Sequence, residues 1–331
     1  MNVLYTCDNK YAWLMGISMI SLFDNNKKMK HLTVYLLGEN ISNENKLILQ
    51  KIASNYQREI HIIDVPELDI PEILVSRRWP LSAFTRLFSG QLLPEAIDKV
   101  LYLDCDTIIS GSIQGLEDFS MDGATFCGVK DCIGKTYKKN IGLSNETLYI
   151  NAGVVLIDLQ KLRNIPVSEW IDSYLKKYTS YINYADQDLL NGVFRERIGV
   201  LQPEYNVMTI AAVNTYEEII TLRKPTNFYS KDLLQHAVQN PKIIHYTTNM
   251  LTIRPWYNNT DHPFAHEFTK YFKTSPWKDR TLNSFTFITK ESKTIKAIRI
   301  FPTSISNKIL GIIHSELKPR YIRLKAKRKH N

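Results

Sequence analysis

The first 64 residues alternate between strand and helix patterns, and this alternation constrains the fold more than any other feature of the chain. Apolar strands are expected at 2–6, 32–37 and 60–64, with helices at 11–23 and about 42–56 between them. Crossovers of this kind favour parallel pairing, so the sequence predicts an α/β fold with a Rossmann-like, mostly parallel central sheet flanked by helices. The chain has neither a GxGxxG after its first strand nor a GxxxxGK[ST], which disfavours dinucleotide-binding and P-loop proteins.

The stretch 99–107, KVLYLDCDT, is a predicted buried strand that ends in two carboxylates. Asp104 and Asp106 are therefore expected at the carboxyl edge of a strand, where an open α/β sheet forms its ligand crevice. If the backbone stays extended, residues two apart point the same way, and both carboxylates could bind one hard divalent cation. The alternative is a turn or solvated loop, in which Asp-x-Asp arises by chance.

Further polar residues adjoin other predicted strands. His245 ends a strand at 242–246 and can bind a metal, although a solitary histidine is more often structural. Asn151 and Gly153 lie near the start of a strand at 149–159. The amide can donate to and accept from a hydroxyl, and glycine lets another group approach the backbone closely, with an ordinary strand kink as the alternative.

Helical segments carry the remaining candidates. Arg86 lies on a helix expected at 82–92, just before the acid pair, where it could face an anion or serve as a structural arginine. Asp186 and Asp188 open a helix in ADQDLLNGVF and could simply cap it, and Ser168 is the predicted N-cap of a helix that reaches about residue 178.

Composition indicates a soluble globular protein of one large domain or two ordinary ones, with 331 residues, 44% hydrophobic and 23% charged. The cysteines show no CxxC pair, so we expect reduced thiols rather than a disulfide framework or zinc ribbon. They are Cys7, Cys105, Cys127 and Cys132. The N-terminus lacks a signal-peptide pattern, and the apolar stretch 11–23 is too short to span a bilayer, which together predict a cytoplasmic protein.

The C-terminal 42 residues are strongly basic. From residue 290 onward there are twelve Lys or Arg against two Glu, a net charge of +10, so the total of +9 leaves 9 − 10 = −1 for the rest. Apolar and aromatic residues alternate with these cations, as in segments that lie on an anionic membrane surface. Nucleic acid would also satisfy the charge, and a solvated tail is the ordinary alternative. Two other stretches, 66–80 and 195–240, are irregular or hard to assign.

In order and approximate spacing, the motifs resemble those of glycosyltransferase family 8. They are LYTCDNKY, the helix with Arg86, YLDCD, NAGVVLIDL, ADQDLLN and HYTTNMLTIRPW. The chain is most similar to bacterial galactosyl- and glucosyltransferases that build lipopolysaccharide, capsule or other surface glycans, and the resemblance covers about residues 1–260. It implies a GT-A fold, a UDP-glucose or UDP-galactose donor, Mn²⁺ with Mg²⁺ as the alternative, retention of anomeric configuration, and a glycan or lipid-linked acceptor.

The same resemblance assigns roles to individual residues. It implies that a manganese ion would be bound by Asp104, Asp106 and His245. Positions expected to contact the donor are Thr6, Asp8, Asn9, Tyr11, Arg86, Asp104, Cys105, Asp106 and Arg254. Positions expected around the transferred sugar, and hence catalytic, are Asn151, Asp186 and Gln187.

One motif departs from the family. The usual His-x-x-Gly-x-x-Lys-Pro-Trp is replaced by His245, Thr248 and, after a longer interval, Arg254-Pro255-Trp256. Arg254 keeps a cation for the diphosphate, but the loop over the donor must differ.

The expected organisation is a GT-A catalytic domain at 1–260, with a nucleotide-sugar half at about 1–110 and an acceptor half at about 111–260. A C-terminal extension follows at 261–331, ending in a basic helical tail. This tail would place the protein peripherally on the inner face of the cell membrane, and no nucleic-acid partner is expected.

Three functional hypotheses remain, and a retaining transferase is the favoured one. Gln187 is a weak nucleophile and Asp186 a plausible one, but no sequence feature shows Asp186 poised for attack, so front-face attack is favoured over a covalent intermediate. One rival is a metal-dependent UDP-sugar hydrolase or nucleotidyltransferase, which typically needs further acids for a second metal. Another is a non-catalytic protein that binds a nucleotide sugar or an anionic surface.

Overall fold

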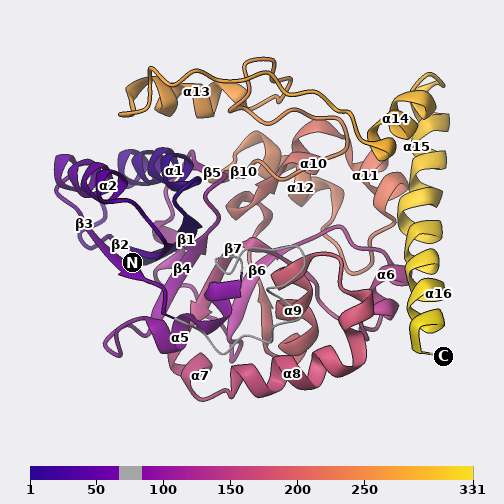
Figure 1. The fold of residues 1–331 in the computed structure, drawn as a ribbon, viewed down its shortest axis with the longest axis horizontal. Helices are drawn as coiled ribbons and strands as arrows, with labels where there is room; N and C mark the ends of the chain where they lie inside the picture. The colour runs from indigo at the N-terminus through magenta and orange to yellow at the C-terminus, as the bar shows by residue number, and fades with distance from the viewer. Residues whose placement is uncertain (67–83, 331) are drawn as a thin grey trace.

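The computed structural model describes residues 1–66 and 84–330, and a seven-stranded mixed sheet forms its centre (Figure 1). The strand order is β3-β2-β1-β4-β7-β6-β8. The strands are β1 (Asn2–Asp8), β2 (Thr33–Glu39), β3 (Glu59–Asp64), β4 (Lys99–Leu103), β6 (Phe126–Lys130), β7 (Ile150–Asp158) and β8 (Ile198–Val200). β3, β2, β1 and β4 are parallel, as predicted, but β7 runs antiparallel to both β4 and β6. Because β7 runs the opposite way, its first residues lie at the carboxyl edge of β4.

A small second sheet continues from this edge. It consists of β5 (Thr107–Ile109), β10 (Ile243–His245) and β9 (Val207–Met208), in that order. β10 pairs antiparallel with β5 and parallel with β9. Two segments more than a hundred residues beyond β4 are thereby held beside its carboxyl end.

Alternating strand side chains divide the core between the two faces of the sheet. Leu101 and Leu103 of β4 join one buried cluster and Val100 and Tyr102 join the other, as the two-residue strand period requires. Figure 1 shows α1 and α2 on one side and α7, α8 and α9 on the other. The described α-helices up to residue 239 are α1 (Ala12–Asn25), α2 (Asn43–Asn55), α5 (Ser89–Leu92), α6 (Lys135–Asn140), α7 (Leu159–Arg163), α8 (Val167–Tyr178), α9 (Ala185–Val193), α10 (Thr209–Val213), α11 (Tyr216–Arg223) and α12 (Lys231–Gln239).

Two local predictions need correction, and a third is untested. The helix expected at 82–92 is, in its described part, a 3₁₀ turn at Thr85–Phe88 followed by the short α5. Ser168 is not an N-cap, because α8 begins at Val167 with Pro166 in the cap position. The irregular stretch predicted at 66–80 lies outside the described residues apart from Pro66.

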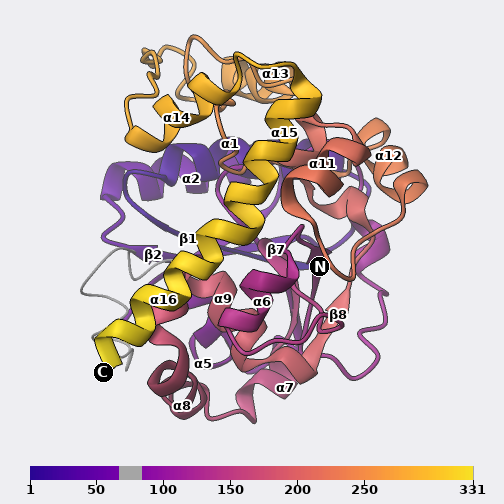
Figure 2. The same ribbon diagram turned by 90° about the vertical axis from the view of Figure 1, so that its right-hand side faces the viewer.

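The C-terminal extension begins near α1, crosses the top of the molecule as seen in Figure 1, and ends in helices at its right-hand side. After α13 (Ala265–Thr274) come α14 (Lys290–Ile298), α15 (Thr303–Ile312), a π-helical segment (Ile313–Leu317) and α16 (Lys318–His330). Figures 1 and 2 show α16 running beside α6.

Buried apolar side chains attach this extension to the body. Ile295 of α14 and Leu310 of α15 form a cluster with Leu222 of α11. Within the described parts of the chain, no helix is both long and apolar enough to cross a membrane.

Candidate active site

Asp104, Asp106 and His245 converge at the carboxyl edge of β4. Each offers one ligand atom, and these atoms lie within 4.8 Å of one another. The backbone between the two acids is a turn, not the extended strand that the sequence prediction assumed. β5 begins directly after this turn, and its pairing with β10 places His245 opposite Thr107. The register of the small sheet thus brings an imidazole to the acid pair, and the group could hold a divalent metal ion.

Hydrogen bonds fix the ring of His245. Its Nδ1 lies 3.0 Å from Asn206 Oδ1, and Asn206 Nδ2 donates to Asn151 Oδ1 at 2.9 Å. Since the amide N–H is used on Asn151, the amide oxygen faces the ring, and we assign the proton to Nδ1. Nε2 then points at Asp106 Oδ1, 3.2 Å away, and at Asp104 Oδ2, 3.6 Å away. An imidazole held in this way presents Nε2 as a metal ligand.

The acid pair and the imidazole shift each other's protonation. Burial opposes the charged form of His245, but Asp106 and Asp104 outweigh it and raise its pKa. Burial also opposes charge on Asp106, yet His245 and Arg254 lower the pKa of this carboxyl. A metal ion and a proton would therefore compete for the same Nε2.

Gly153 makes room for the site, as the sequence suggested. A Cβ on this residue would overlap the ring of His245 and the carboxylate of Asp104. Its carbonyl also accepts a hydrogen bond from the Asp104 N–H at 2.7 Å. The close approach of backbone and ring therefore requires glycine here.

Arg86 lies between two carboxylates and is almost fully buried. One guanidinium nitrogen lies 3.0 Å from Asp104 Oδ1, and Nε lies 3.2 Å from Asp186 Oδ2. A third nitrogen donates to Ala152 O at 2.6 Å, and the guanidinium stacks 4.0 Å from the centre of the Tyr102 ring. These contacts support the structural interpretation of Arg86, because its ion pairs hold Asp104 and Asp186 in position. That Arg86 faces an anion stays a prediction.

Asp186 faces this arginine at the start of α9. Burial raises the pKa of Asp186 to about 6, although Arg86 acts in the opposite direction. The preceding Ala185 has φ +44°, a left-handed conformation that costs a non-glycine residue about 1–2 kcal/mol. Backbone strain beside a buried carboxylate is often found at functional sites.

Asp188, two residues later, is structural. Its carboxylate accepts hydrogen bonds from the hydroxyls of Tyr137 and Tyr149 and from the N–H groups of Asn183 and Tyr184. Asp188 therefore stabilises the start of α9, as the capping interpretation suggested, whereas Asp186 faces Arg86.

Gln187 and Asn151 form a connected amide pair. Gln187 Oε1 accepts from Asn151 Nδ2 at 3.0 Å and from the Ala152 N–H at 3.2 Å, while Gln187 Nε2 donates to Asp131 Oδ2 at 3.0 Å. Through Asn206 this network is continuous with His245.

Sequence reasoning missed Asn206 and Asp131. Asp131 follows β6 directly, so the strand-end rule that identified Asp104 could have found it. Asn206 lies in the stretch that could not be assigned, and no sequence signal marks it.

The loop after β1 approaches the site from the other side of β4. Asp8 Oδ1 accepts from the Lys10 and Tyr11 N–H groups, and Asn9 Oδ1 accepts from Ser42 N and Asn45 Nδ2. Asn9 therefore joins the loop to the start of α2.

Three further donor-contact candidates lie nearby. The Thr6 hydroxyl is 3.2 Å from that of Tyr102, and Cys105 Sγ is 3.6 Å from Thr6 O. Burial raises the pKa of Tyr11, and the positive charge of the nearby Arg254 opposes this shift. All four cysteines are free, as predicted.

Arg254 reaches the site in spite of the altered motif. Its guanidinium is 3.8 Å from Asp106 Oδ2 and lies 4.5 Å from the centre of the Trp256 ring. The longer loop after His245 therefore still delivers a cation to the acid pair, as the Arg-Pro-Trp sequence suggested.

Comparisons with known proteins agree with this architecture. General stress protein A of Bacillus subtilis is 22% identical over 84% of this chain and 94% of its own length. Lipopolysaccharide 1,2-glucosyltransferase of Escherichia coli K12 is 27% identical over 95% of this chain and 90% of its own length. The solved structure of the galactosyltransferase LgtC with donor and acceptor sugar analogs superposes with a TM-score of 0.71, at 22% identity, over 85% of this chain and all of LgtC.

The likeness to LgtC establishes the GT-A fold that was predicted. The sequence profile of "Glycosyl transferase family 8" matches residues 2–260, most of the chain. The protein is therefore a member of glycosyltransferase family 8.

Proposed function

We propose that this glycosyltransferase moves a hexose, glucose or galactose, from a UDP-sugar to a hydroxyl of a cell-surface glycan or lipid-linked oligosaccharide, with Mn²⁺ and with retention. The observation that carries the proposal is the convergence of Asp104, Asp106 and His245 on one point, next to Asp186 and Gln187. Lipopolysaccharide glucosyl- and galactosyltransferases among the relatives support the surface-glycan acceptor.

The three converging residues suit a metal ion of this kind. Two carboxylate oxygens and one imidazole nitrogen are ligands that Mn²⁺ accepts, with Mg²⁺ as the alternative. When bound, the ion would offset the negative charge of the departing diphosphate.

The chain's own residues would do the remaining work of donor binding. Arg254, beside Asp106, adds a cation where the diphosphate would lie, and its stacking on Trp256 limits the orientations of its fork. The end of β1 and the loop after it would receive the uridine, through Thr6, Asp8, Asn9 and Tyr11. Cys105 lies in the turn between the two aspartates, and we expect it to contact the UDP-sugar there.

Retention by front-face attack is supported by the partners of the two nucleophile candidates. Asp186 Oδ2 is paired with Arg86, which reduces its nucleophilicity, and both ends of the Gln187 amide are already hydrogen-bonded. The acceptor hydroxyl would attack from the side on which UDP departs, and the leaving phosphate oxygen would take its proton. A glycosyl adduct on Asp186, detected by mass spectrometry of the enzyme with donor, would contradict this choice.

We further propose that residues 261–331 are an extension that holds the catalytic domain, residues 1–260, against the inner face of the membrane. Large apolar side chains on the extension are exposed, and cations such as Lys308 and Lys325 lie among them on α15 and α16. The exposed apolar residues are Ile288, Ile300, Phe301, Ile305, Ile312, Leu317, Tyr321 and Leu324. Each basic residue near an anionic surface contributes about 1 kcal/mol of attraction.

The test is turnover of a panel of UDP-sugars with and without Mn²⁺. Metal-dependent turnover of one UDP-sugar is expected to fall by about 10²–10³-fold in Asp106→Asn. The exposed Asp118→Asn, the same chemical change away from the site, should leave it unchanged. Turnover that never requires an acceptor would favour a hydrolase. No metal-dependent UDP binding would favour a binding protein that works through its basic tail.

A further inference from the structure

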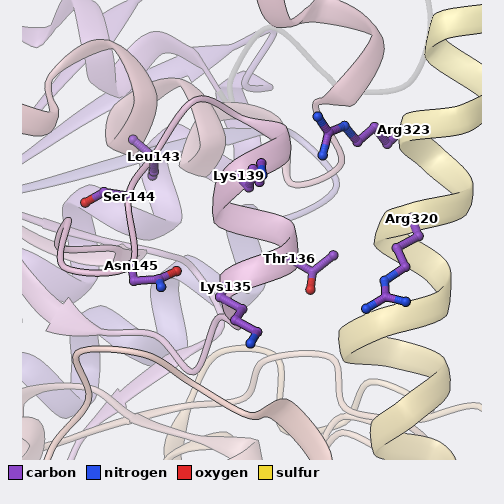
Figure 3. Close-up of a pocket in the computed structure, with 8 residues that line it drawn as sticks. All are labelled: Lys135, Thr136, Lys139, Leu143, Ser144, Asn145, Arg320 and Arg323. Carbon is purple, nitrogen blue, oxygen red and sulfur yellow. The ribbon is translucent and has the colours of Figure 1, made fainter.

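A basic cavity that shares no lining residue with the candidate active site lies between α6 and α16 (Figure 3). Its volume is about 620 Å³, within the range of small-molecule sites. The lining residues include four cations and no carboxylate. They are Lys135, Thr136, Lys139, Leu143, Ser144, Asn145, Arg320 and Arg323.

The two helical walls of the cavity are joined by specific contacts. The buried Asn140 of α6 donates to the carbonyl of Pro319 on α16 at 2.8 Å. Thr136 donates to Glu316 Oε2 at 3.3 Å, just before α16 begins. The spacing between the cations of α6 and those of α16 is therefore set by the fold.

The third wall is a loop held by a buried lysine. Lys138 points inward and donates to the carbonyls of Asn145 and Thr147. Ser144 and Thr147 hydrogen-bond to each other through side chain and backbone. The polar groups of Ser144 and Asn145 thus line the cavity in a pre-organised loop.

Most of the positive charge in this cavity is not neutralised by the protein. Among the described residues, no carboxylate lies within ion-pair distance of Lys135, Lys139 or Arg323, whereas Arg320 pairs with Glu316. Glu316 is also shared with Lys224, so it offsets little of the remaining charge. Cations gathered around one cavity repel each other, and an anion placed among them would remove this repulsion.

We propose that the cavity between α6 and α16 binds a terminal phosphate group carried by a saccharide or by a lipid headgroup. A phosphomonoester carries about −1.5 to −2 charges at neutral pH and three acceptor oxygens, enough to engage cations from both helices at once. The arginine forks suit phosphate oxygens, and the volume leaves room for a sugar beside the phosphate.

Binding of a soluble probe tests the site directly. In titration calorimetry, glucose 6-phosphate and inorganic phosphate should bind to the full-length protein and glucose should not. The double variant Lys139→Gln/Arg323→Gln removes one cation from each wall and should weaken binding at least about tenfold. The matched control Lys28→Gln/Lys51→Gln removes the same charge from exposed positions after α1 and on α2, outside both the cavity and the C-terminal extension, and should leave binding unchanged.

A vesicle experiment distinguishes the two sources of phosphate. Sedimentation would compare phosphatidylcholine vesicles that contain phosphatidic acid, a phosphomonoester, with vesicles that contain phosphatidylglycerol, a phosphodiester, at matched surface charge. A preference for phosphatidic acid that only the cavity variant loses identifies a lipid headgroup. Binding of the soluble sugar phosphate without such a preference identifies a saccharide.

Two outcomes would overturn the proposal. One is that neither the soluble phosphates nor phosphatidic acid binds in preference to its control. The other is that the cavity and control variants lose binding equally, which would make the attraction a property of the protein's overall positive charge.

Discussion

The candidate active site and the α6/α16 cavity use cations in opposite ways. Arg86 is buried, and its guanidinium already contacts two carboxylates, a carbonyl and an aromatic ring. Arg323 is exposed and has no carboxylate partner among the described residues. A buried cation requires partners within the protein because its desolvation is costly. An exposed cation stays hydrated and remains available to bind an anionic ligand.

The difference indicates what each region is built to bind. In the active site, positive charge holds acids in position, and the acids in turn can hold a metal ion. In the cavity, cations without a carboxylate partner line the open space, and this arrangement favours binding of an anion. The following predictions test this contrast.

The largest expected effect separates the two arginines. Arg86→Gln leaves the buried Asp186 and the partly buried Asp104 without their cation and should lower the free energy of unfolding by about 3–5 kcal/mol. Arg323→Gln should change it by less than about 0.5 kcal/mol. Urea denaturation of both variants measures this, and similar values for the two would contradict the contrast.

Two glycines test close packing, one in the candidate active site and one where α15 meets α11. Gly153→Ala places a methyl group against His245 and Asp104 and should weaken Mn²⁺ binding at least about tenfold. Gly311→Ala on α15 meets the backbone carbonyl of Thr221 and should loosen the C-terminal helices from α11 without changing metal affinity. Calorimetric metal titration and limited proteolysis read out these effects. Unchanged metal affinity in Gly153→Ala would argue against the assigned ligands.

Asn206 tests whether the ring of His245 is positioned by its amide neighbour. Asn206→Ala removes the acceptor from Nδ1 and should reduce Mn²⁺ affinity about 10–100-fold. Asn214→Ala, which loses only a bond to the Ile210 carbonyl, is the matched control. Equal affinities in both variants would show that Asn206 has no part in presenting the ligand.

The smallest effect is a pH dependence of stability. Burial lowers the pKa of His262 to about 4, and its Nδ1 accepts the Phe264 N–H, so the folded protein holds this ring neutral. Because its unfolded pKa is near 6.5, the folded state binds fewer protons between pH 6.5 and 4, and stability falls as pH drops through this window. His262→Gln should flatten the fall between pH 7 and pH 5 by at most about 2 kcal/mol, measured by urea denaturation at both pH values. An unchanged slope would exclude this histidine as its source.

Strand-end reasoning found much of the candidate site and failed for definite reasons. Asp104, Asp106, Asn151 and His245 each adjoin a short apolar strand, and parallel strands bring such ends to one edge. Asn206 follows a 3₁₀ turn in an unassigned stretch, so no periodicity marked it. The antiparallel direction of β7, which brings Asn151 to the edge through its first residues, is likewise invisible in a local pattern.

The α/β class, the family resemblance and the division into a nearly neutral body and a basic tail could all be predicted from the sequence. They depend on periodicity, motif order and charge, which are properties of the chain before it folds. Tertiary packing places Asp186 against Arg86, whereas Asp188 accepts hydrogen bonds from two tyrosines. These acids are two residues apart on one helix, and their roles differ because α9 presents them to different neighbours. The tertiary structure also decided that α16 lies against α6, since a cavity formed by segments far apart in the chain depends on packing that no local pattern records.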